Sequence, residues 1–491
     1  MGEALSLNRR HDVARALRAF LPQRAVLFEE EDTRPYECDG LTAYRQLPMV
    51  VALPETEEQV QRILKVCSSM QVPVVPRGAG TGLSGGALPP GDGVLLSMAK
   101  FMRVMRIDPR ARVAVVQPGV RNAVISEVAA PHGLYYAPDP SSQIACTIGG
   151  NVAENSGGVH CLKYGLTVHN VLRVRGFTID GEPLEVGSEA LDAPGLDLLA
   201  LAIGSEGMLF VVTEVTVKLL PKPQCARVIM ASFDEVEKAG NAVAAIIAAG
   251  IIPAGLEMMD RPATRAVEQF VAAGYDLEAA AILLCESDGT ESEVEHEIAR
   301  MEAVLHAAGA VRCTVSRNEA ERLRFWSGRK AAFPAVGRIS PDYYCMDGTI
   351  PRKRLGEVLN FIAEMEKKYG LRCPNVFHAG DGNLHPLILF DANNAEELHR
   401  TEEFAAEVLE KCVAVGGTIT GEHGVGVEKI NQMCTQFGTA ELELFHAVKQ
   451  AFDRQALLNP GKAVPTLARC AEYGRMHVHG GKLPHPELPR F

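Results

Sequence analysis

The apolar and polar positions near the start of the chain predict short strands and helices before a glycine-rich loop. Residues 44–54 (YRQLPMVVALP) and 72–76 (VPVVP) each hold a short apolar run bounded by proline, which is typical of a buried strand. The intervening residues 55–70 (ETEEQVQRILKVCSSM) space their apolar side chains three and four positions apart, which indicates a helix. This part of the chain therefore predicts strand, helix and strand in succession.

From about residue 222 the pattern becomes a regular alternation of strands and helices. Strand-like runs occupy residues 226–233 (ARVIMASF), 251–259 (IIPAGLEMM) and 280–287 (AAILLCES). Helical patterns occupy residues 234–249 (DEVEKAGNAVAAIIAA) and 291–309 (ESEVEHEIARMEAVLHAAG). Such alternation favours a separate α+β sheet domain.

Composition and charge exclude several classes of protein. The chain has 491 residues, 47% of them hydrophobic, and a net charge of -12, which argues against a nucleic-acid partner. The first residues lack the apolar core of a secretory signal, and the most apolar run, residues 242–256, is broken by Gly250 and Pro253. We therefore expect a cytoplasmic protein that reaches the inner membrane, if at all, only peripherally through partners.

The first glycine-rich loop follows the strand at residues 72–76. Gly80, Gly82 and Gly85 satisfy G-x-G-x-x-G, but prolines and another strand-like run follow where a Rossmann motif would open a helix. Closely spaced glycines leave backbone N–H groups free to bind an anion such as a pyrophosphate. The alternative is a flexible surface loop.

Two further glycine-rich segments follow, at residues 145–158 and 202–207. The first contains the run CTIGGNVAENSGG and the second AIGSEG, after which the sequence becomes strand-like. Three loops whose backbones can approach a ligand closely imply a long, flat cofactor that carries phosphate.

A pair of histidines flanks a turn at residues 375–390 (NVFHAGDGNLHPLILF). The Asp-Gly dipeptide at 381–382 is typical of a two-residue hairpin, and with that turn His378 faces His385 on the same side of the ribbon. Two imidazoles so placed can bind one metal ion. The alternative is that both histidines pack or form hydrogen bonds as ordinary core residues.

A third metal ligand is predicted in residues 416–430 (GGTITGEHGVGVEKI). Glu422 and His423 stand between glycines, and neighbouring residues of an extended segment point in opposite directions. Glu422 could then face the metal and His423 the substrate. Two histidines and one carboxylate would leave coordination positions open for a substrate.

A cationic pair, Arg329 and Lys330, follows the only tryptophan in residues 324–351 (RFWSGRKAAFPAVGRISPDYYCMDGTIP). An arginine can bind a carboxylate through two parallel hydrogen bonds. The alternative is a solvated charge pair on a helix.

The glycine-rich motifs, taken in order with PDPSS at residues 138–142, resemble the FAD-binding domain of the vanillyl-alcohol oxidase / p-cresol methylhydroxylase (PCMH) flavoprotein family. No histidine lies between Pro76 and Pro90, where some relatives attach FAD covalently, so we expect non-covalent FAD. The resemblance implies FAD contacts from Pro76, Arg77, Gly78, Ala79, Gly80, Thr81, Gly82, Pro138, Ser141, Gly149, Gly150, Asn151, Ser156, Gly157, Gly204, Glu206, Gly207, Glu422 and Asn459.

The motifs FHAGDGNLHP and GEHGVG resemble the D-2-hydroxy-acid dehydrogenase branch of this family. So do WSGRKAAFPAVGRISPDYYCMDGTIPR and the ending CAEYGRMHVH, which are most similar to the flavin-bearing subunits of glycolate-oxidising complexes. The resemblance implies a divalent metal (Zn, Mn or Fe) on His378, His385 and Glu422, and His423 as the general base. It further implies Arg329, Asn383 and Tyr343 as substrate-binding residues, with Tyr344 a weaker candidate.

The resemblance implies an α+β fold: a PCMH-type FAD-binding domain of two subdomains, residues 1–221, and a ferredoxin-like cap with the metal site, residues 222–423. Residues 424–491 would return to the FAD domain. Some relatives that take dicarboxylic acids have a lysine near the position of Cys345; its absence here favours a small monocarboxylate.

The function implied is oxidation of glycolate to glyoxylate, and of D-lactate to pyruvate. The cysteines are scattered singly, without the clustered runs that hold iron–sulfur centres, so electrons would pass to an iron–sulfur subunit, with a second FAD-type subunit beside it. Alternatives are a stand-alone D-lactate dehydrogenase, a metallohydrolase using the two histidines and Glu422, and a flavin subunit without catalytic activity.

Overall fold

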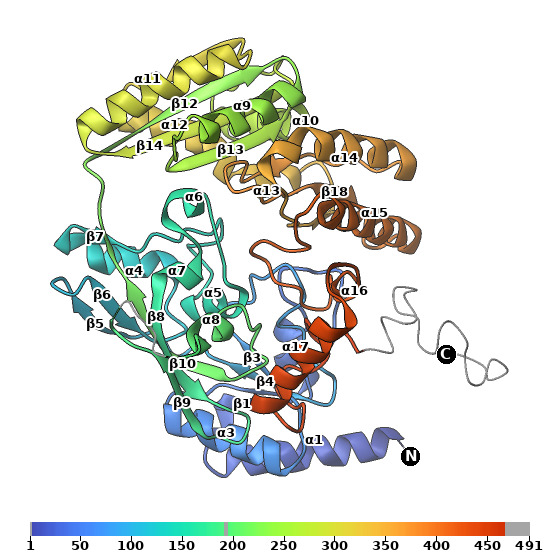
Figure 1. Cartoon of the computed structure of the whole chain (residues 1–491). Coiled ribbons are helices and arrows are strands. Elements are labelled where there is room, and N and C mark those ends of the chain that lie inside the picture. The colour runs from blue at the N-terminus through green and yellow to red at the C-terminus, as the bar shows by residue number, and fades with distance from the viewer. Residues whose placement is uncertain (1, 191–194, 467–491) are drawn as a thin grey trace.

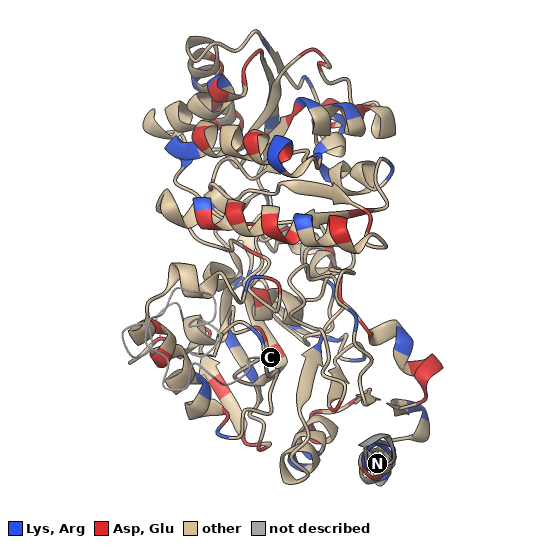
Figure 2. Cartoon of the chain, turned by 90° about the vertical axis from the view of Figure 1, so that its right-hand side faces the viewer, with Lys and Arg blue, Asp and Glu red and all other residues tan. Residues whose placement is uncertain are grey.

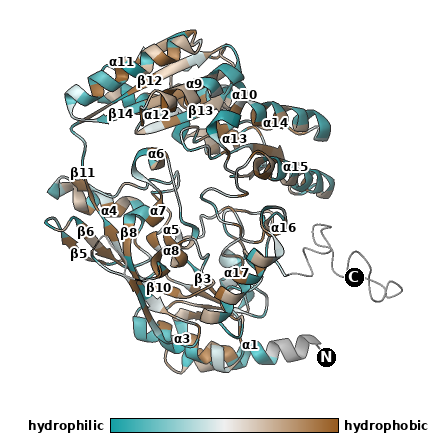
Figure 3. Cartoon of the chain, in the orientation of Figure 1, coloured by the Kyte–Doolittle hydropathy of each residue, from teal (hydrophilic) through white to brown (hydrophobic). Residues whose placement is uncertain are grey.

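The computed structural model describes residues 2–190 and 195–466, with side chains from residue 8 onward. The chain forms two lobes, and both the first helix and the last helix lie in the lower lobe of Figure 1. The interior strands of both lobes are apolar, whereas the outer helices present polar residues (Figure 3). Acidic and basic side chains are interspersed over the outer helices of both lobes (Figure 2).

The first sheet of the lower lobe confirms the predicted strand, helix and strand. Its strand order is β1-β2-β4-β3, and β2, β4 and β3 are parallel. The apolar face of α3, which includes Ile63 and Leu64, packs on this sheet together with α1. The elements are α1 (Gly2–Arg18), β1 (Val26–Leu27), α2 (Glu30–Thr33), β2 (Val50–Ala52), α3 (Glu57–Ser69), β3 (Val74–Arg77) and β4 (Val94–Ser97).

The second sheet of the lower lobe is antiparallel, with the order β5-β6-β10-β8-β9. Short helices connect its strands and bring the second and third glycine-rich segments beside the first. The elements are β5 (Val104–Asp108), β6 (Val113–Val116), α4 (Asn122–Ala129), β7 (Leu134–Tyr135), α5 (Ile148–Glu154), α6 (Cys161–Tyr164), α7 (Thr167–Asn170), β8 (Val171–Phe177), β9 (Pro183–Gly187), α8 (Leu198–Ala202), β10 (Val211–Lys218) and β11 (Leu220–Pro221), which pairs with β7.

The upper lobe is built on one antiparallel sheet of order β15-β12-β14-β13-β17. Its strands and helices succeed each other as in a ferredoxin-like fold, which confirms the predicted α+β cap. Alternate strand residues face opposite layers: Ile229 packs towards α9 and α11, and Met230 towards α10 and α12. The elements are β12 (Cys225–Phe233), α9 (Val236–Ala248), β13 (Gly255–Asp260), α10 (Arg261–Val271), β14 (Ala281–Gly289), α11 (Glu291–Ala307), β15 (Arg312–Val315), α12 (Glu319–Lys330) and β17 (Val376–Phe377).

The rest of the upper lobe wraps the end of this sheet, and the chain then returns to the lower lobe. Leu458 forms a parallel bridge with Val74 of β3, and Lys449 donates to the carbonyl of Met208. The elements are α13 (Ala332–Val336), β16 (Asp342–Cys345), α14 (Leu355–Tyr369), β18 (Leu387–Phe390), α15 (Ala395–Ala414), α16 (Met433–Gln436) and α17 (Thr439–Phe452). The predicted motif at residues 470–479 lies outside the described residues.

Charged side chains join the lobes at α6, and we call this group the interlobe latch. His160 lies between Asp139 of its own lobe (Nδ1–Oδ2, 2.8 Å) and Glu286 of β14 (Nε2–Oε1, 3.3 Å). Lys163 Nζ lies 2.6 Å from an oxygen of Asp288. The latch consists of Asp139, His160, Lys163, Tyr164, Glu286 and Asp288.

No helix within the described ranges is both long enough and apolar enough to span a bilayer.

Candidate active site

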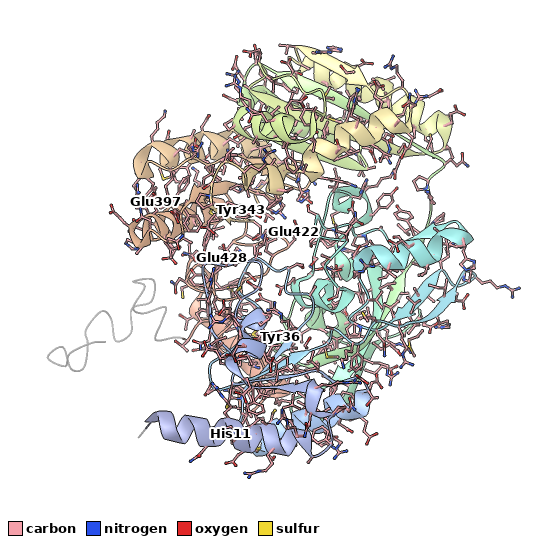
Figure 4. All side chains as sticks on the ribbon, turned by 180° about the vertical axis from the view of Figure 1, so that it is seen from behind. His11, Tyr36, Tyr343, Glu397, Glu422 and Glu428 are labelled. Atoms are coloured by element: carbon pink, nitrogen blue, oxygen red, sulfur yellow. The ribbon has the colours of Figure 1, made fainter. Side chains whose placement is uncertain are left out.

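A cavity of about 560 Å³ lies where the two lobes meet, and the three predicted glycine-rich loops line it. Residues of the cap complete its wall. Figure 4 shows Tyr343 of β16 and Glu422 of the loop after α15 in this region. The loops lie together because they begin or end at elements of the same lobe. The first loop follows β3, the second leads into α5, and the third leads into β10.

Most of the predicted cofactor-binding residues lie on the cavity wall. They are Pro76, Arg77, Gly78, Ala79, Gly80, Thr81, Gly82, Ser141, Gly149, Gly150, Asn151, Ser156, Glu206, Gly207 and Glu422. The wall does not include Pro138, Gly157, Gly204 or Asn459. Asn459 instead donates to the carbonyls of Gly86 and Glu206 from behind the wall, and Pro138 accepts from Asn122.

The first loop needs glycine for steric reasons. Gly80 has φ +72°, and a Cβ there would overlap the Arg77 guanidinium. A Cβ on Gly78 would come 2.5 Å from Thr147 Oγ1 of the next loop. Two backbones can thus approach each other and a ligand between them, which fits a cradle for the phosphate-bearing middle of a dinucleotide.

Several buried polar atoms on the cavity wall make no hydrogen bond within the described part of the chain. On the side of the cofactor loops they include Thr147 Oγ1 and Glu154 Oε2. Burial, and after it the charge of Glu206, raises the pKa of Glu154 well above its ordinary value. Unpaired buried polar atoms on the wall of a cavity fit a polar cofactor that satisfies them.

The two histidines meet, but not through the predicted turn. The backbone pairs His378 with Asn383 and Asn375 with Pro386, so the turn has four residues, 379–382, and not two. The predicted pairing of His378 with His385 was wrong by two positions. A shift of two keeps every side chain on its face of the ribbon, because side-chain direction repeats every two residues. The rings lie diagonally, with centroids 4.9 Å apart.

Glu422 joins the two histidines. Its Oε1 lies 3.3 Å from His378 Nε2 and 3.2 Å from His385 Nε2, and one ligand atom from each of the three residues falls within 4.8 Å of the others. All three side chains are largely buried. Two nitrogens and one oxygen so close together form the donor set of a three-ligand site for a divalent transition metal.

The protonation states of His385 and Glu422 suit metal binding. In His378, by contrast, burial opposes the charge but Glu257 and Glu422 raise the pKa well above its ordinary value. Burial lowers the pKa of His385 to about 4, so the ring is neutral, and neither of its nitrogens makes a hydrogen bond to any described residue. Burial opposes the charge of Glu422, but the two neighbouring histidines hold its pKa well below the ordinary value. The residues therefore fit a metal ion, which would satisfy the unpaired nitrogen.

His423 stacks on His385, with ring centroids 4.9 Å apart and planes 5° apart. We expected Glu422 and His423 to point in opposite directions from an extended segment, and this was wrong. The backbone curls around Asp347, whose Oδ2 accepts hydrogen bonds from three consecutive N–H groups, of Gly421, Glu422 and His423, at 2.9, 2.8 and 2.7 Å. Both side chains therefore reach the same histidine, His385.

Asp347 holds the backbone of this cluster, and the sequence analysis missed it. It is fully buried and lies 3.0 Å from Lys429 Nζ. Burial opposes its charge, but Lys429 and the backbone donors lower its pKa to about 2. The available signal was an aspartate next to glycine between two apolar stretches, which is equally typical of a turn.

Arg329 lies one layer behind the cavity wall and is 1% exposed, so the alternative of a solvated charge pair fails for it. Its Nη2 lies 2.8 Å from Glu257 Oε2, while Nε and Nη2 make no hydrogen bond among the described residues. Asn383 is also buried off the wall, whereas Tyr343 lies on it. The sequence analysis did not place Lys330, Phe333 and Pro334 at the site, but all three line the cavity.

Phe333 forms an aromatic wall beside the histidines. Its ring centroid lies 5.8 Å from that of Tyr343 and 6.3 Å from that of His385. His385 is thus bounded by Phe333 on one side and by the stacked His423 on another. The space for a substrate lies between this wall and the cofactor loops.

Comparisons with known families match two segments of the chain. Residues 48–187 match the family model described as an FAD binding domain. Residues 222–463 match the model of the C-terminal domain of FAD linked oxidases. The first segment contains the first two cofactor loops, and the second contains the His378, His385 and Glu422 cluster.

Several named proteins are similar over nearly the whole chain. Glycolate oxidase subunit GlcD of Escherichia coli K12 is 64% identical over 98% of this chain and 97% of the relative, and GlcD of Bacillus subtilis is 38% identical over 88% and 93%. A D-lactate dehydrogenase of Archaeoglobus fulgidus is 32% identical over 93% and 99%. Among solved structures, substrate-bound p-cresol methylhydroxylase aligns with a TM-score of 0.80 at 16% identity, over 94% of this chain and 98% of that one, which shows the shared fold.

Proposed function

The chain belongs to the FAD-linked oxidase family, and on that premise we propose that it oxidises a small 2-hydroxy acid. The substrates would be glycolate, giving glyoxylate, and D-lactate, giving pyruvate, and the chain would act as the catalytic subunit of a glycolate oxidase complex. The observation that carries the proposal is the cluster of His378, His385, Glu422 and His423, of which the last three line the cavity that the cofactor loops also line. The names of two glycolate oxidase relatives support the same substrate class.

FAD would be held without a covalent bond by the three glycine-rich loops and, when bound, supplies the acceptor for the hydride of the α-carbon. The wall leaves Thr147 and Glu154 unpaired, which supports a polar ligand there. Residues of the cap close the other side of the cavity. They keep bulk water from the substrate and so strengthen the electrostatic interactions inside.

A divalent metal, Zn, Mn or Fe, would be held by His378, His385 and Glu422 and, when bound, supplies a Lewis acid that makes the substrate hydroxyl more acidic. The carboxylate of the substrate would lie towards Arg329, whose Nε makes no hydrogen bond to any described residue and is suited to donate to it. Asn383 and Tyr343 would complete this end of the site.

His423 would take the hydroxyl proton of the substrate. Its ring is buried against His385, and Nδ1 makes no hydrogen bond among the described residues, so a nitrogen is open to a proton. The oxidation would then balance, because the substrate would give up the hydride of its α-carbon, for which FAD would supply the acceptor, and its hydroxyl proton, which His423 would take. Asp347 contributes by fixing the backbone that carries both Glu422 and His423.

Electrons would leave the reduced flavin through an iron–sulfur subunit, beside a second FAD-type subunit. The word "subunit" in the names of the two glycolate oxidase relatives supports partner chains in general. Attachment to the inner membrane would be peripheral and through those partners. We keep residues 1–221, 222–423 and 424–491 as the proposed division into FAD-binding domain, cap and returning segment.

A stand-alone D-lactate dehydrogenase is the second candidate, and the similarity to named D-lactate dehydrogenases favours it. Glycolate and D-lactate differ by one methyl group, which a pocket distinguishes by only ~1–3 kcal/mol. A metallohydrolase would not need flavin loops on the same cavity. A silent flavin subunit would not need the clustered histidines.

The test is anaerobic reduction of the bound flavin. Purified FAD-loaded chain is mixed with glycolate, D-lactate or L-lactate, and the visible absorbance of the flavin is followed with and without a chelator. We expect bleaching by glycolate and D-lactate, slower or no bleaching by L-lactate, and loss of bleaching after chelation with restoration by added metal. A yellow protein that none of the three acids bleaches would refute the proposed substrate class.

A further inference from the structure

We propose that Glu257 is a positioning residue whose one carboxylate holds both His378 and Arg329, so that metal affinity and substrate affinity depend on the same side chain. The inference rests on the proposed function, because His378 acts there as a metal ligand and Arg329 as the partner of the substrate carboxylate.

Glu257 lies in the middle of β13, between β14 and β17, and is 1% exposed. Its two oxygens contact two different groups. Oε1 lies 2.8 Å from His378 Nδ1, and Oε2 lies 2.8 Å from Arg329 Nη2. A carboxylate this deeply buried is tolerated only where partners balance its charge, and these two partners come from different parts of the cap, α12 and the segment after β17.

The contact with His378 orients its imidazole ring for metal binding. With Nδ1–H donated to Glu257, the lone pair of Nε2 points to the cluster, where Nε2 lies 3.3 Å from Glu422 Oε1. Carboxylates that bind the far nitrogen of a metal-ligating histidine set its orientation and tautomer. Their loss typically costs about 10–100-fold in metal affinity.

The contact with Arg329 is a second reason to expect that metal binding depends on Glu257. Arg329 is 1% exposed, and Glu257 is the carboxylate that balances its charge. Without that carboxylate, an unbalanced guanidinium would lie beside a site that binds a divalent cation, and the repulsion would weaken metal binding further. The same change would free Arg329 to move and so reduce its hold on the substrate.

A matched pair on the same helix provides the control. Arg322 and Arg329 are separated by two turns of α12, and Arg322 Nη1 lies 2.7 Å from Glu286 of β14, much as Arg329 meets Glu257 of β13. Glu286 is 2% exposed, so it matches Glu257 in burial, and it too pairs with an arginine of α12, although Arg322 is more exposed and also binds Glu319. Its histidine partner is His160 of the latch and not a residue of the metal cluster.

The experiment compares FAD-loaded full chains carrying Glu257→Gln or Glu286→Gln. Zn²⁺ affinity is measured by equilibrium dialysis with elemental analysis, and glycolate kinetics by anaerobic flavin reduction. For Glu257→Gln we expect a Zn²⁺ Kd raised about 10–100-fold and a raised KM, with kcat at saturating Zn²⁺ and glycolate within about threefold of the wild type. For Glu286→Gln we expect wild-type Zn²⁺ affinity.

Wild-type Zn²⁺ affinity in Glu257→Gln, or an equal loss in both variants, would overturn the inference. If Glu257→Gln does not fold with FAD, Glu257→Asp replaces it, because the shorter side chain keeps the charge but cannot reach both partners. That variant should also bind Zn²⁺ several-fold more weakly, and unchanged affinity there overturns the inference as well. A wild-type chain that binds none of Zn²⁺, Mn²⁺ and Fe²⁺ would refute the proposed metal site and this inference together.

Discussion

His423 is the residue whose side chain bears most directly on the proposed proton transfer. It stacks on the metal-ligand candidate His385, and its backbone is fixed by Asp347. Because a positioned base contributes about 10²–10⁴-fold, His423→Ala should slow anaerobic flavin reduction by glycolate by that factor while FAD and Zn²⁺ remain bound. Stopped-flow absorbance measures the rate, and the exposed His399 on α15 provides a control substitution. Reduction at the wild-type rate in His423→Ala would refute the role.

Phe333 bounds the space beside the histidines, so it should limit the size of the substrate. Its ring contacts Tyr343 and His385 on the cavity wall. Phe333→Ala should raise kcat/KM for 2-hydroxybutyrate relative to glycolate by about tenfold, because one methylene in an apolar pocket is worth ~1–3 kcal/mol. Competition assays measure the ratio, and Phe270, exposed on α10, provides the control alanine variant. An unchanged ratio would place the size limit elsewhere.

The residues of the cluster could be predicted from sequence, but their supporting partners could not. His378, His385 and Glu422 meet as the resemblance implies, even though the assumed turn was wrong, because a shift of two positions preserves the face of a strand. Glu257 shows no local signal except an acid within an apolar strand. Its partners lie 72 and 121 residues away in sequence, and only the sheet register brings them together.

At the scale of elements, the interlobe latch should make the stability of the folded protein depend on pH. Burial opposes the charge of His160, but Asp139 and Glu286 outweigh this effect and raise its pKa well above the ordinary value. Because the folded-state pKa is raised, the stabilisation is fully present below about pH 6.5 and is lost as pH rises through the folded-state pKa. Arg322, which binds Glu286, and Lys163, which binds Asp288, are the cations that also face this group.

His160→Gln should therefore lower the thermal midpoint more at about pH 6 than well above the folded-state pKa, where the wild type has lost the same charge. Thermal scans of both chains across this range measure the difference, with His399→Gln as the exposed control. A difference in midpoint that stays constant with pH would show that the charge of His160 does not stabilise the latch.

Helices and strands were predicted correctly where a single spacing of apolar residues ran through the whole element. The helix at residues 55–70 appears as α3, and the alternation after residue 222 appears as β12, α9, β13, β14 and α11. The sequence analysis missed α10, which follows β13 directly. Asp260 serves both as the last residue of β13 and as the N-cap of α10, accepting from Ala263 N, so no turn separates the two elements.

At the scale of the whole molecule, the site exists only because three distant segments converge. The cavity is lined by the cofactor loops of the lower lobe, by Tyr343 and His385 of the cap, and by Glu422 and His423 of the loop after α15. No local pattern predicts that convergence. The convergence was expected only from the resemblance to a family with the same fold. The hydrophobic pattern alone predicted short strands and helices near the start of the chain and a separate α+β domain after residue 222.

The distribution of cysteines along the chain bears on how electrons would leave the reduced flavin. The cysteines of the sequence are scattered singly, without the runs that hold an iron–sulfur centre, so the reduced flavin should depend on an external acceptor. With glycolate-reduced chain, we expect reoxidation by O₂ to be at least about tenfold slower than flavin reduction, a barrier difference of ~1.4 kcal/mol, and reoxidation by a one-electron dye to be fast.

Stopped-flow mixing of the reduced chain with oxygenated buffer or with the dye measures both rates. The His423→Ala variant, reduced chemically with dithionite, is the control: its reoxidation should match the wild type, because the proton acceptor of the first half-reaction has no part in electron exit. Reoxidation by O₂ as fast as reduction by glycolate would instead make the chain self-sufficient. An iron–sulfur partner would then be unnecessary for turnover, and the stand-alone alternative would become the better account of this molecule.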